Sequence, residues 1–198
     1  SALLQDGGYE FQTFSYNLLE GRSVDAALKM RMDPGKMNRV FIVSESEAFV
    51  NDAIRNLSLL CHETAGYKVT LYGNSKIKTF ETIEAENLHL TNLHLSLPYN
   101  VNYDDARVKD FLMKYRAIFN TEPTAFAFQG YDLTYFFISE VAKYGDNWYE
   151  WFTQDSASLL QADFSFSRQE GSDNAGFVNS ALRHVVYGPD FNITSVNL

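Results

Sequence analysis

The chain has 198 residues, of which 45% are hydrophobic and 15% aromatic, so it can build a full core and is not a disordered chain. Its formal net charge of −9 disfavours nucleic acid and anionic membrane surfaces as partners, because both repel an acidic protein. No apolar run in the sequence reaches the length that spans a bilayer. The single Cys61 excludes an internal disulfide, and the four histidines lack the spacing of a zinc site. We therefore expect a globular chain with no metal and no cofactor.

The first half of the chain alternates predicted strands with predicted helices. Strands are predicted at 10–16, 39–43, 67–72 and 88–97, and helices at 23–32 and 47–63. The run from Val40 to Val43 is continuously apolar, which is typical of a parallel strand covered on both faces. Within 88–97 the alternation of leucines changes phase, which we interpret as a bulge or bend near Thr91-Asn92. Strand–helix–strand order predicts parallel pairing with right-handed crossovers.

Short polar segments follow the second and third predicted strands. Ser44 and Glu47 have the spacing of a capping box, which predicts that they satisfy free backbone N–H groups at the start of the next helix. Gly73, Asn74 and Ser75 end the strand at 67–72. Ligands of open α/β sheets bind outside the carboxyl ends of parallel strands. Ser44, Glu45, Gly73 and Asn74 are therefore candidate ligand-binding residues, and the alternative is that both segments are ordinary turns and caps.

Two helices, at 104–119 and 124–144, are predicted in the second half, separated by a turn at Pro123. In the second helix, one apolar stripe contains Leu133, Phe137 and Val141, and a neighbouring stripe contains Gly130, Thr134, Ile138 and Ala142. This pattern predicts a buried helix with Phe137 and Val141 in the core. Beyond Gly145, alternating residues at 160–166 and 177–187 flank a polar loop at 168–176, which predicts an antiparallel hairpin.

We therefore predict a three-layer α/β/α fold. A mainly parallel doubly wound sheet carries helices on both faces, and the C-terminal part adds an antiparallel strand or hairpin. Residues 1–198 form a single domain in this prediction.

The string from Phe111 to Asp132 resembles the second lobe of type I periplasmic solute-binding proteins, the family of the leucine/isoleucine/valine-binding proteins. The matching residues are Phe111, Tyr115, Phe119, Glu122, Pro123, Ala127, Gly130, Tyr131 and Asp132. The resemblance extends from about Gly8 to the C-terminus and covers one lobe only. It implies a non-enzymatic ligand-recognition lobe of a bacterial envelope protein, located in the periplasm or cell envelope. The two lobes of such proteins close around an amino acid or similar small polar solute.

The resemblance also implies partners and a further site residue. The expected partners are the small ligand, the first lobe of the same protein, and an ABC permease or a fused wall-binding domain. Tyr131 is similar in position to an aromatic residue of the family's cleft, although it could equally be a core tyrosine. The chain departs from the amino-acid binders at Asn74, where they often carry an acidic residue for the ligand ammonium, and Glu45 could substitute for it.

Two other functions are consistent with the sequence. One is an envelope interaction or scaffold module that keeps the fold without transport, and a fused wall-binding domain would favour it. The other is an enzyme of flavodoxin-like or hydrolase type. The sequence has no G-x-S-x-G, P-loop or G-x-G-x-x-G motif, and Asp104-Asp105 is expected to cap a helix rather than act as a catalytic pair.

Overall fold

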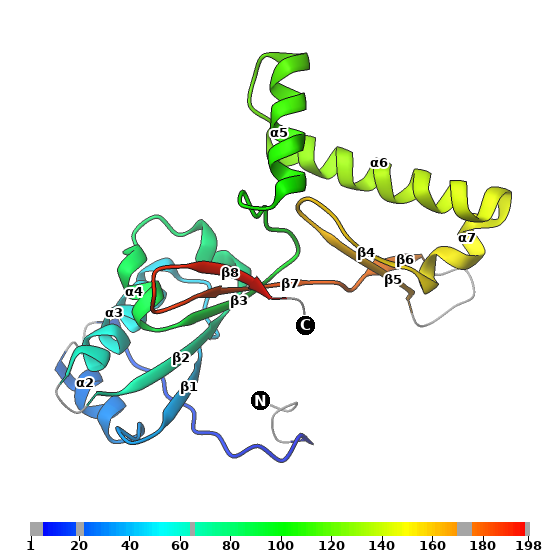
Figure 1. Cartoon of the computed structure of the whole chain (residues 1–198). Coiled ribbons are helices and arrows are strands. Elements are labelled where there is room, and N and C mark those ends of the chain that lie inside the picture. Colours follow the sequence, from blue (N-terminus) through cyan, green and yellow to red (C-terminus); the bar gives the residue numbers. More distant parts are fainter. Residues whose placement is uncertain (1–5, 19–21, 64–65, 170–175, 197–198) are drawn as a thin grey trace. The chain divides into compact units, whose positions relative to one another are not determined.

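The chain has an α/β fold with a mainly parallel five-stranded sheet and a separate three-stranded antiparallel sheet (Figure 1). The computed structural model describes residues 6–18, 22–63, 66–169 and 176–196. It divides into two compact units, Ser1–Leu95 with Val186–Thr194 and Ser96–Val185 with Ser195–Leu198. The predicted fold class is confirmed.

The first unit is built around the parallel strands of the five-stranded sheet, whose order is β1-β2-β3-β7-β8. Its elements are α2 (Arg22–Lys29), β1 (Met37–Phe41), α3 (Glu47–His62), β2 (Lys68–Gly73), the 3₁₀ helix η2 (Ser75–Thr79), α4 (Ala85–Leu90) and the start of β3 (Leu93–Leu97). The sheet also contains β7 (Arg183–Tyr187) and β8 (Ile193–Val196). Val40 pairs with Leu71, and Leu71 with Leu93. Helix α3 contacts β2 and buries Ile54 and Leu57.

Two predictions about the outer strands are wrong. Residues 10–16 are described but form no strand, and β1 lies at the edge of the sheet. Phe41 is 55% exposed and Val43 is 95% exposed, so this run is not covered on both faces. An apolar run reports β propensity but does not distinguish a central strand from an edge strand. Among the described residues, β2 is the strand that pairs with β1, and β1 exposes the alternate residues Met37, Arg39 and Phe41.

The bulge or bend predicted within a strand near Thr91-Asn92 is also wrong, because the phase change marks the junction between α4 and β3. Thr91 is fully buried and donates its hydroxyl to the Asn87 carbonyl at 2.7 Å, which closes the last turn of α4. Asn92 follows in the left-handed region with φ 46°, and asparagine tolerates this conformation well. Leu88 therefore lies on a helix, while Leu93 begins a strand.

The second unit contains the two predicted long helices and the antiparallel sheet. Its elements are α5 (Ala106–Phe119), α6 (Ala125–Tyr144), η3 (Gly145–Asn147), α7 (Trp148–Trp151), η4 (Phe152–Gln154), β4 (Ser156–Ser158), β5 (Asp163–Arg168) and β6 (Phe177–Asn179). Strand β5 pairs antiparallel with both β4 and β6, which confirms the predicted hairpin. Most of its predicted loop, residues 170–175, lies outside the described residues.

The ends of α5 follow from local side-chain chemistry. Asp105 caps its start by accepting the Arg107 backbone N–H at 2.7 Å, as predicted for this acidic pair. The helix ends at Phe119, and Asn120 adopts the left-handed conformation with φ 52°. Arg116 then holds Glu122 through two hydrogen bonds of 2.7 and 2.9 Å. The Glu122-Pro123 turn between the helices is thus fixed to the last turn of α5.

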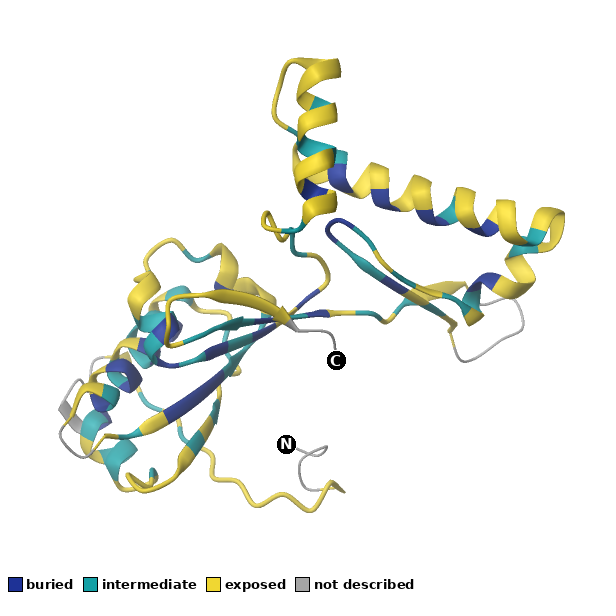
Figure 2. Cartoon of the chain, in the orientation of Figure 1, coloured by how far each residue is buried: buried dark blue, intermediate teal, exposed yellow. Residues whose placement is uncertain are grey.

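The buried face of α6 differs from the predicted stripes. It contains Phe128, Asp132, Phe136 and Glu140, which recur every four residues along one side of the helix (Figure 2). Val141 is 46% exposed, so its predicted place in the core is wrong. The apolar pattern predicts the wrong face because two of the four buried residues are carboxylic acids. Such residues are almost never buried without partners, so the pattern places them on the exposed side.

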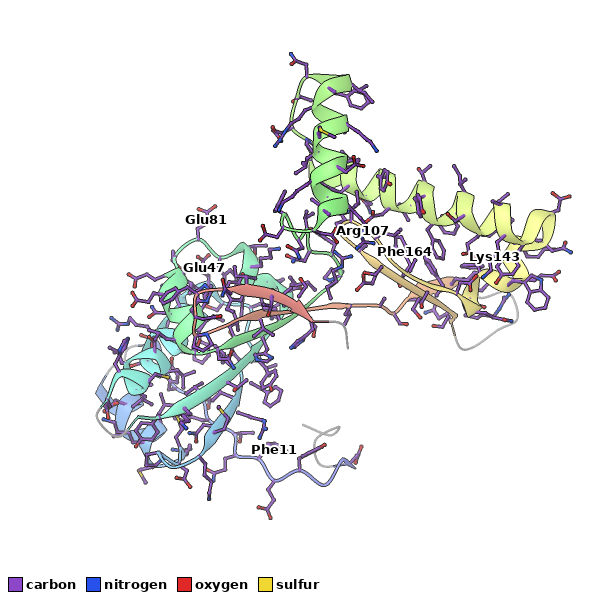
Figure 3. All side chains as sticks on the ribbon, viewed as in Figure 1. Phe11, Glu47, Glu81, Arg107, Lys143 and Phe164 are labelled. Atoms are coloured by element: carbon purple, nitrogen blue, oxygen red, sulfur yellow. The ribbon has the colours of Figure 1, made fainter. Side chains whose placement is uncertain are left out.

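Aromatic side chains form the core between α6 and the antiparallel sheet. Phe136, Phe152 and Phe164 are buried together, and Phe137 packs against them while half-buried. The ring centroids of Phe136 and Phe164 are 5.2 Å apart, within the range of favourable aromatic contacts. Figure 3 labels Phe164 on the hairpin. The prediction that Phe137 belongs to the core is therefore confirmed, and Phe137 lies at the edge of this cluster.

Candidate functional site

The segments after β1 and β2 meet at the carboxyl ends of these two strands. Asn74 donates its side-chain amide to the Ser44 carbonyl at 3.3 Å, and its amide oxygen accepts the Lys76 N–H at 3.1 Å. Parallel pairing of Phe41 with Tyr72 places both strand ends at the same edge of the sheet. The structure thus brings Ser44 and Asn74 together. Both polar groups of Asn74 are already used to hold backbone, one of them as the cap of η2.

Glu45 lies beside Lys76 and forms an ion pair with it. Both side chains are more than half exposed, so solvent screens the pair and its contribution to stability is small. The neighbouring Ser44 hydroxyl accepts the Ser46 backbone N–H at 3.2 Å. The charge of Lys76 partly neutralises the Glu45 carboxylate, which weakens the attraction of that carboxylate for a ligand ammonium. The same lysine provides a cation next to that carboxylate.

The predicted capping box of Ser44 and Glu47 does not form. Ser46 is the N-cap of α3 and makes no side-chain cap hydrogen bond. The Glu47 carboxylate instead accepts the backbone N–H groups of Glu81 and Thr82, both at 2.9 Å, and the Thr82 hydroxyl at 2.8 Å. These bonds, led by the Thr82 N–H, hold the pKa of Glu47 below its usual value. Glu47 therefore connects the start of α3 to the segment after η2, and Figure 3 labels it with Glu81.

Gly73 is required by packing. A Cβ added there would lie 2.2 Å from Cδ1 of Ile77 and 3.4 Å from Cδ2 of Leu95, and Ile77 is almost fully buried. A contact of 2.2 Å is far shorter than the separation of carbon atoms in van der Waals contact. The absence of a side chain at Gly73 thus lets η2 close tightly over the end of β2. Any ligand contact from Gly73 would involve its backbone.

Tyr131 belongs to the second unit, on α6. Its ring lies between Phe111 of α5 and Tyr135, with centroid separations of 5.0 and 5.9 Å, and the residue is 41% exposed. It is therefore a partly exposed member of an aromatic row rather than a fully buried core tyrosine. The role of Tyr131 in ligand binding remains a prediction.

Sequence reasoning missed a row of rings across β1, β2 and β3. Phe41 pairs with Tyr72, and Tyr72 with His94, in the parallel register. The ring centroids are 4.7 and 5.1 Å apart, and the Phe41 and Tyr72 rings are nearly parallel. The three rings share the sheet face opposite Val40 and Leu71, because side chains alternate along each strand. The row follows from the register in which the three strands pair. That register could not be derived from the sequence, because it depends on where each strand begins and ends.

Sequence reasoning also missed a buried carboxylate on α6. Asp132 has no exposed surface and accepts three backbone N–H groups, from Leu160 at 2.9 Å, Gln161 at 2.9 Å and Ala162 at 3.0 Å. These donors belong to the turn between β4 and β5. Three hydrogen bonds from backbone N–H groups replace the water that this carboxyl group loses on burial. The aspartate of the Gly-Tyr-Asp string thus fixes this turn.

Arg183 holds the carbonyl side of the same turn. Its guanidinium is buried and donates to the carbonyl oxygens of Leu159 at 2.6 Å, Leu160 at 3.1 Å and Ala162 at 3.2 Å. It also pairs with Asp163 and donates to the Asn100 carbonyl at 2.6 Å. Five donors in a rigid fork make arginine suited to such a position. We call Asp132, Arg183 and the residues 159–162 that they hold the turn clamp.

The described residues show no metal site and no membrane-spanning helix. No three His, Cys, Asp or Glu side chains among them gather closely enough to hold a metal ion. In the same ranges, every helix is too short or too polar to cross a bilayer.

Two shallow depressions lie in the first unit, one at 15–18 and one lined by Asp25, Asn56, Leu59, His62 and Glu63. Neither depression includes Ser44, Glu45, Gly73 or Asn74.

The fold is similar to that of ABC transporter substrate-binding proteins. A solved structure of such a protein from Desulfitobacterium hafniense in complex with Leu matches with a TM-score of 0.51 and 12% identity, over 97% of this chain and 53% of that chain. Another structure of a substrate-binding protein from this organism matches with a TM-score of 0.53 and 13% identity, over the same shares. No family model matches the chain, and no curated protein matches it. The chain thus has the fold of these proteins and spans about half their length.

Proposed function

We propose that this chain is one lobe of a two-lobe solute-binding protein and that it recognises a small polar ligand, such as an amino acid, at the carboxyl ends of β1 and β2. The observation that carries the proposal is the fold match to a Leu-bound substrate-binding protein over 97% of this chain but only 53% of that chain. The resemblance of the string from Phe111 to Asp132 to the second lobe of that family supports it independently.

The chemistry of the strand ends suits a zwitterion. The N-terminus of the 16-residue helix α3 lies at this edge, and the missing side-chain cap at Ser46 leaves its first backbone N–H groups available to a ligand carboxylate. Glu45 offers an acceptor to a ligand ammonium, which would compete with Lys76 for it. Ser44 and Asn74 hold the two loops together, and Gly73 lets η2 close over β2. The resemblance also suggests Tyr131 as a ligand-binding residue.

A single lobe makes only part of the hydrogen bonds that a polar solute needs. The other lobe would provide the rest when the two close around the ligand by hinge motion. In this proposal the protein acts without catalysis in the periplasm or cell envelope. It would deliver its ligand to an ABC permease. A wall-binding domain fused to the same protein is the further partner that the resemblance suggests.

Backbone amide NMR shifts of the chain titrated with leucine test the location of the site. The proposal predicts fast-exchange shift changes concentrated at residues 44–49 and 73–76, with little change on the outer surface of the antiparallel sheet. Glu45→Gln should reduce these changes, because it removes the carboxylate that would face the ammonium. The matched control is Glu86→Gln, another exposed carboxylate of the first unit, which should leave them unchanged. Shift changes confined to other residues, or none at saturating leucine, would overturn the proposal.

A further inference from the structure

We propose that the carboxyl groups of Glu140 and Asp155 share a proton and thereby fasten the C-terminal end of α6 to the segment that follows α7, so that this contact is a pH-sensitive latch. The latch lies wholly in the second unit, and it does not depend on the proposed ligand. It is defined by Glu140, Asp155, Lys143 and Tyr144.

Glu140 is buried without the partners that an ionised carboxylate needs. The residue is 5% exposed, and its Oε2 atom is buried with no hydrogen-bond partner in the described structure. Asp132, two turns earlier on the same face of α6, shows the contrast, because it accepts three backbone N–H groups. A buried carboxyl group that lacks such donors is more stable in its neutral form.

Asp155 is held as the ionised member of the pair. Its carboxylate accepts two hydrogen bonds from Lys143 Nζ, at 2.9 and 2.7 Å, and one from the Tyr144 hydroxyl at 2.8 Å. It also lies within hydrogen-bonding reach of the Glu140 side chain. Two carboxylates cannot hydrogen-bond to each other, so the bond requires a proton on one of them. Lys143 marks this end of α6 in Figure 3.

The charged groups around the pair place the proton on Glu140. Burial raises the pKa of Glu140 most, the charge of Asp155 and the hydrogen bond to it raise this pKa further, and Lys143 opposes them. Hydrogen bonds from Lys143, and then from Tyr144, hold the pKa of Asp155 below its ordinary value. Neutral Glu140 therefore donates to ionised Asp155. When pH rises, Glu140 releases its proton to bulk water, and two anions then face each other.

The direction of the pH effect follows from the two pKa shifts. The folded-state pKa of Glu140 is raised, so its contribution to stability is present below the pKa of the unfolded chain and is lost as pH rises through the folded pKa. The folded-state pKa of Asp155 is lowered, so its contribution is lost as pH falls. The latch is strongest between these two limits.

Carboxyl-carbon NMR of the full chain, titrated with pH, tests the latch directly. We expect the Glu140 resonance to titrate with a midpoint above about 4.3, the reference value for glutamate. Asp155→Asn should move this midpoint towards the reference, because it removes the neighbouring charge. A wild-type Glu140 midpoint at or below the reference value would overturn the proposal. This measurement uses the wild-type chain, so it does not depend on whether a variant folds.

Unfolding by denaturant as a function of pH provides the second test. Wild type should lose stability as pH rises above the reference value of glutamate, and Glu140→Gln should not show this loss, because its amide donates to Asp155 at every pH. The matched control, Glu150→Gln, removes an exposed carboxylate of the neighbouring helix α7 and should keep the wild-type profile. An unchanged pH profile in Glu140→Gln would also overturn the latch.

Discussion

Asp132→Asn is the sharpest test of the turn clamp, because it changes one oxygen of a fully buried carboxylate into an NH₂ group. Oδ1 accepts the Leu160 N–H, and Oδ2 accepts those of Gln161 and Ala162. An asparagine that keeps the Oδ2 bonds points its NH₂ group at the Leu160 N–H and leaves that buried donor without an acceptor. One such donor costs about 1–3 kcal/mol, which is the loss of unfolding free energy expected for this variant.

Asp132→Ala should cost more, because it removes the acceptor of all three N–H groups, and two of them, those of Leu160 and Gln161, belong to buried residues. Two unpaired donors give a loss of about 2–6 kcal/mol. Denaturant unfolding measures both variants, and hydrogen exchange of the three turn amides provides a local readout, which should change from slow to fast. The control, Asp104→Asn, alters a side chain that is 98% exposed and should stay within about 0.5 kcal/mol of wild type. If Asp132→Asn also stays within that range and the amides remain protected, the clamp does not hold the turn.

Three further stability predictions use the same unfolding assay. Gly73→Ala should lower the unfolding free energy by about 1–3 kcal/mol, because the added methyl group overpacks the site. Adding Ile77→Val should recover part of this loss, because it removes the Cδ1 atom that the methyl group meets. If the effects of the two substitutions simply add, the contact is refuted. Phe136→Ala should lower the unfolding free energy by about 3–5 kcal/mol, because Phe136 is buried, whereas Val141→Ala should lower it by well under 1 kcal/mol. Equal losses in the two variants would contradict the buried face assigned to α6. Arg183→Lys should destabilise the chain by more than about 1 kcal/mol, because one ammonium cannot satisfy all the carbonyl oxygens of the turn, and a neutral result would contradict its role.

Helices and parallel pairing could be predicted because their signals are local. The apolar spacing of α3 and α5 gives their bounds within a few residues, and the Asp105 cap is evident from its position. A continuous run of β-branched and aromatic residues likewise identifies β1. Its edge position could not be predicted, because that depends on whether 10–16 pairs with it.

Burial of charged residues is the main feature that the sequence concealed. Asp132 and Glu140 interrupt the apolar face of α6, so hydrophobic periodicity assigns them to the solvent side and places Val141 in the core instead. Their burial depends on partners that are distant in sequence, the turn at 159–162 for one and Asp155 for the other. Local patterns contain no information about such partners.

The adjacency of two candidate site residues was predictable, but the details of their surroundings were not. The rule that ligands bind at strand carboxyl ends selects Ser44 and Asn74, and the structure brings these two together. The ion pair between Glu45 and Lys76 and the clash that requires Gly73 depend on how η2 folds back over β2. A 3₁₀ turn of five residues is too short for its side-chain directions to be predicted from periodicity.

Titration calorimetry of the chain with a panel of free amino acids tests the central claim most directly. Binding by one lobe leaves part of the ligand's polar groups in water, and association itself costs several kcal/mol. We therefore expect dissociation constants no tighter than about 1 mM, or roughly −4 kcal/mol. Binding of any amino acid at about 1 μM would show a self-contained pocket and would contradict the account of this chain as one lobe of a two-lobe receptor.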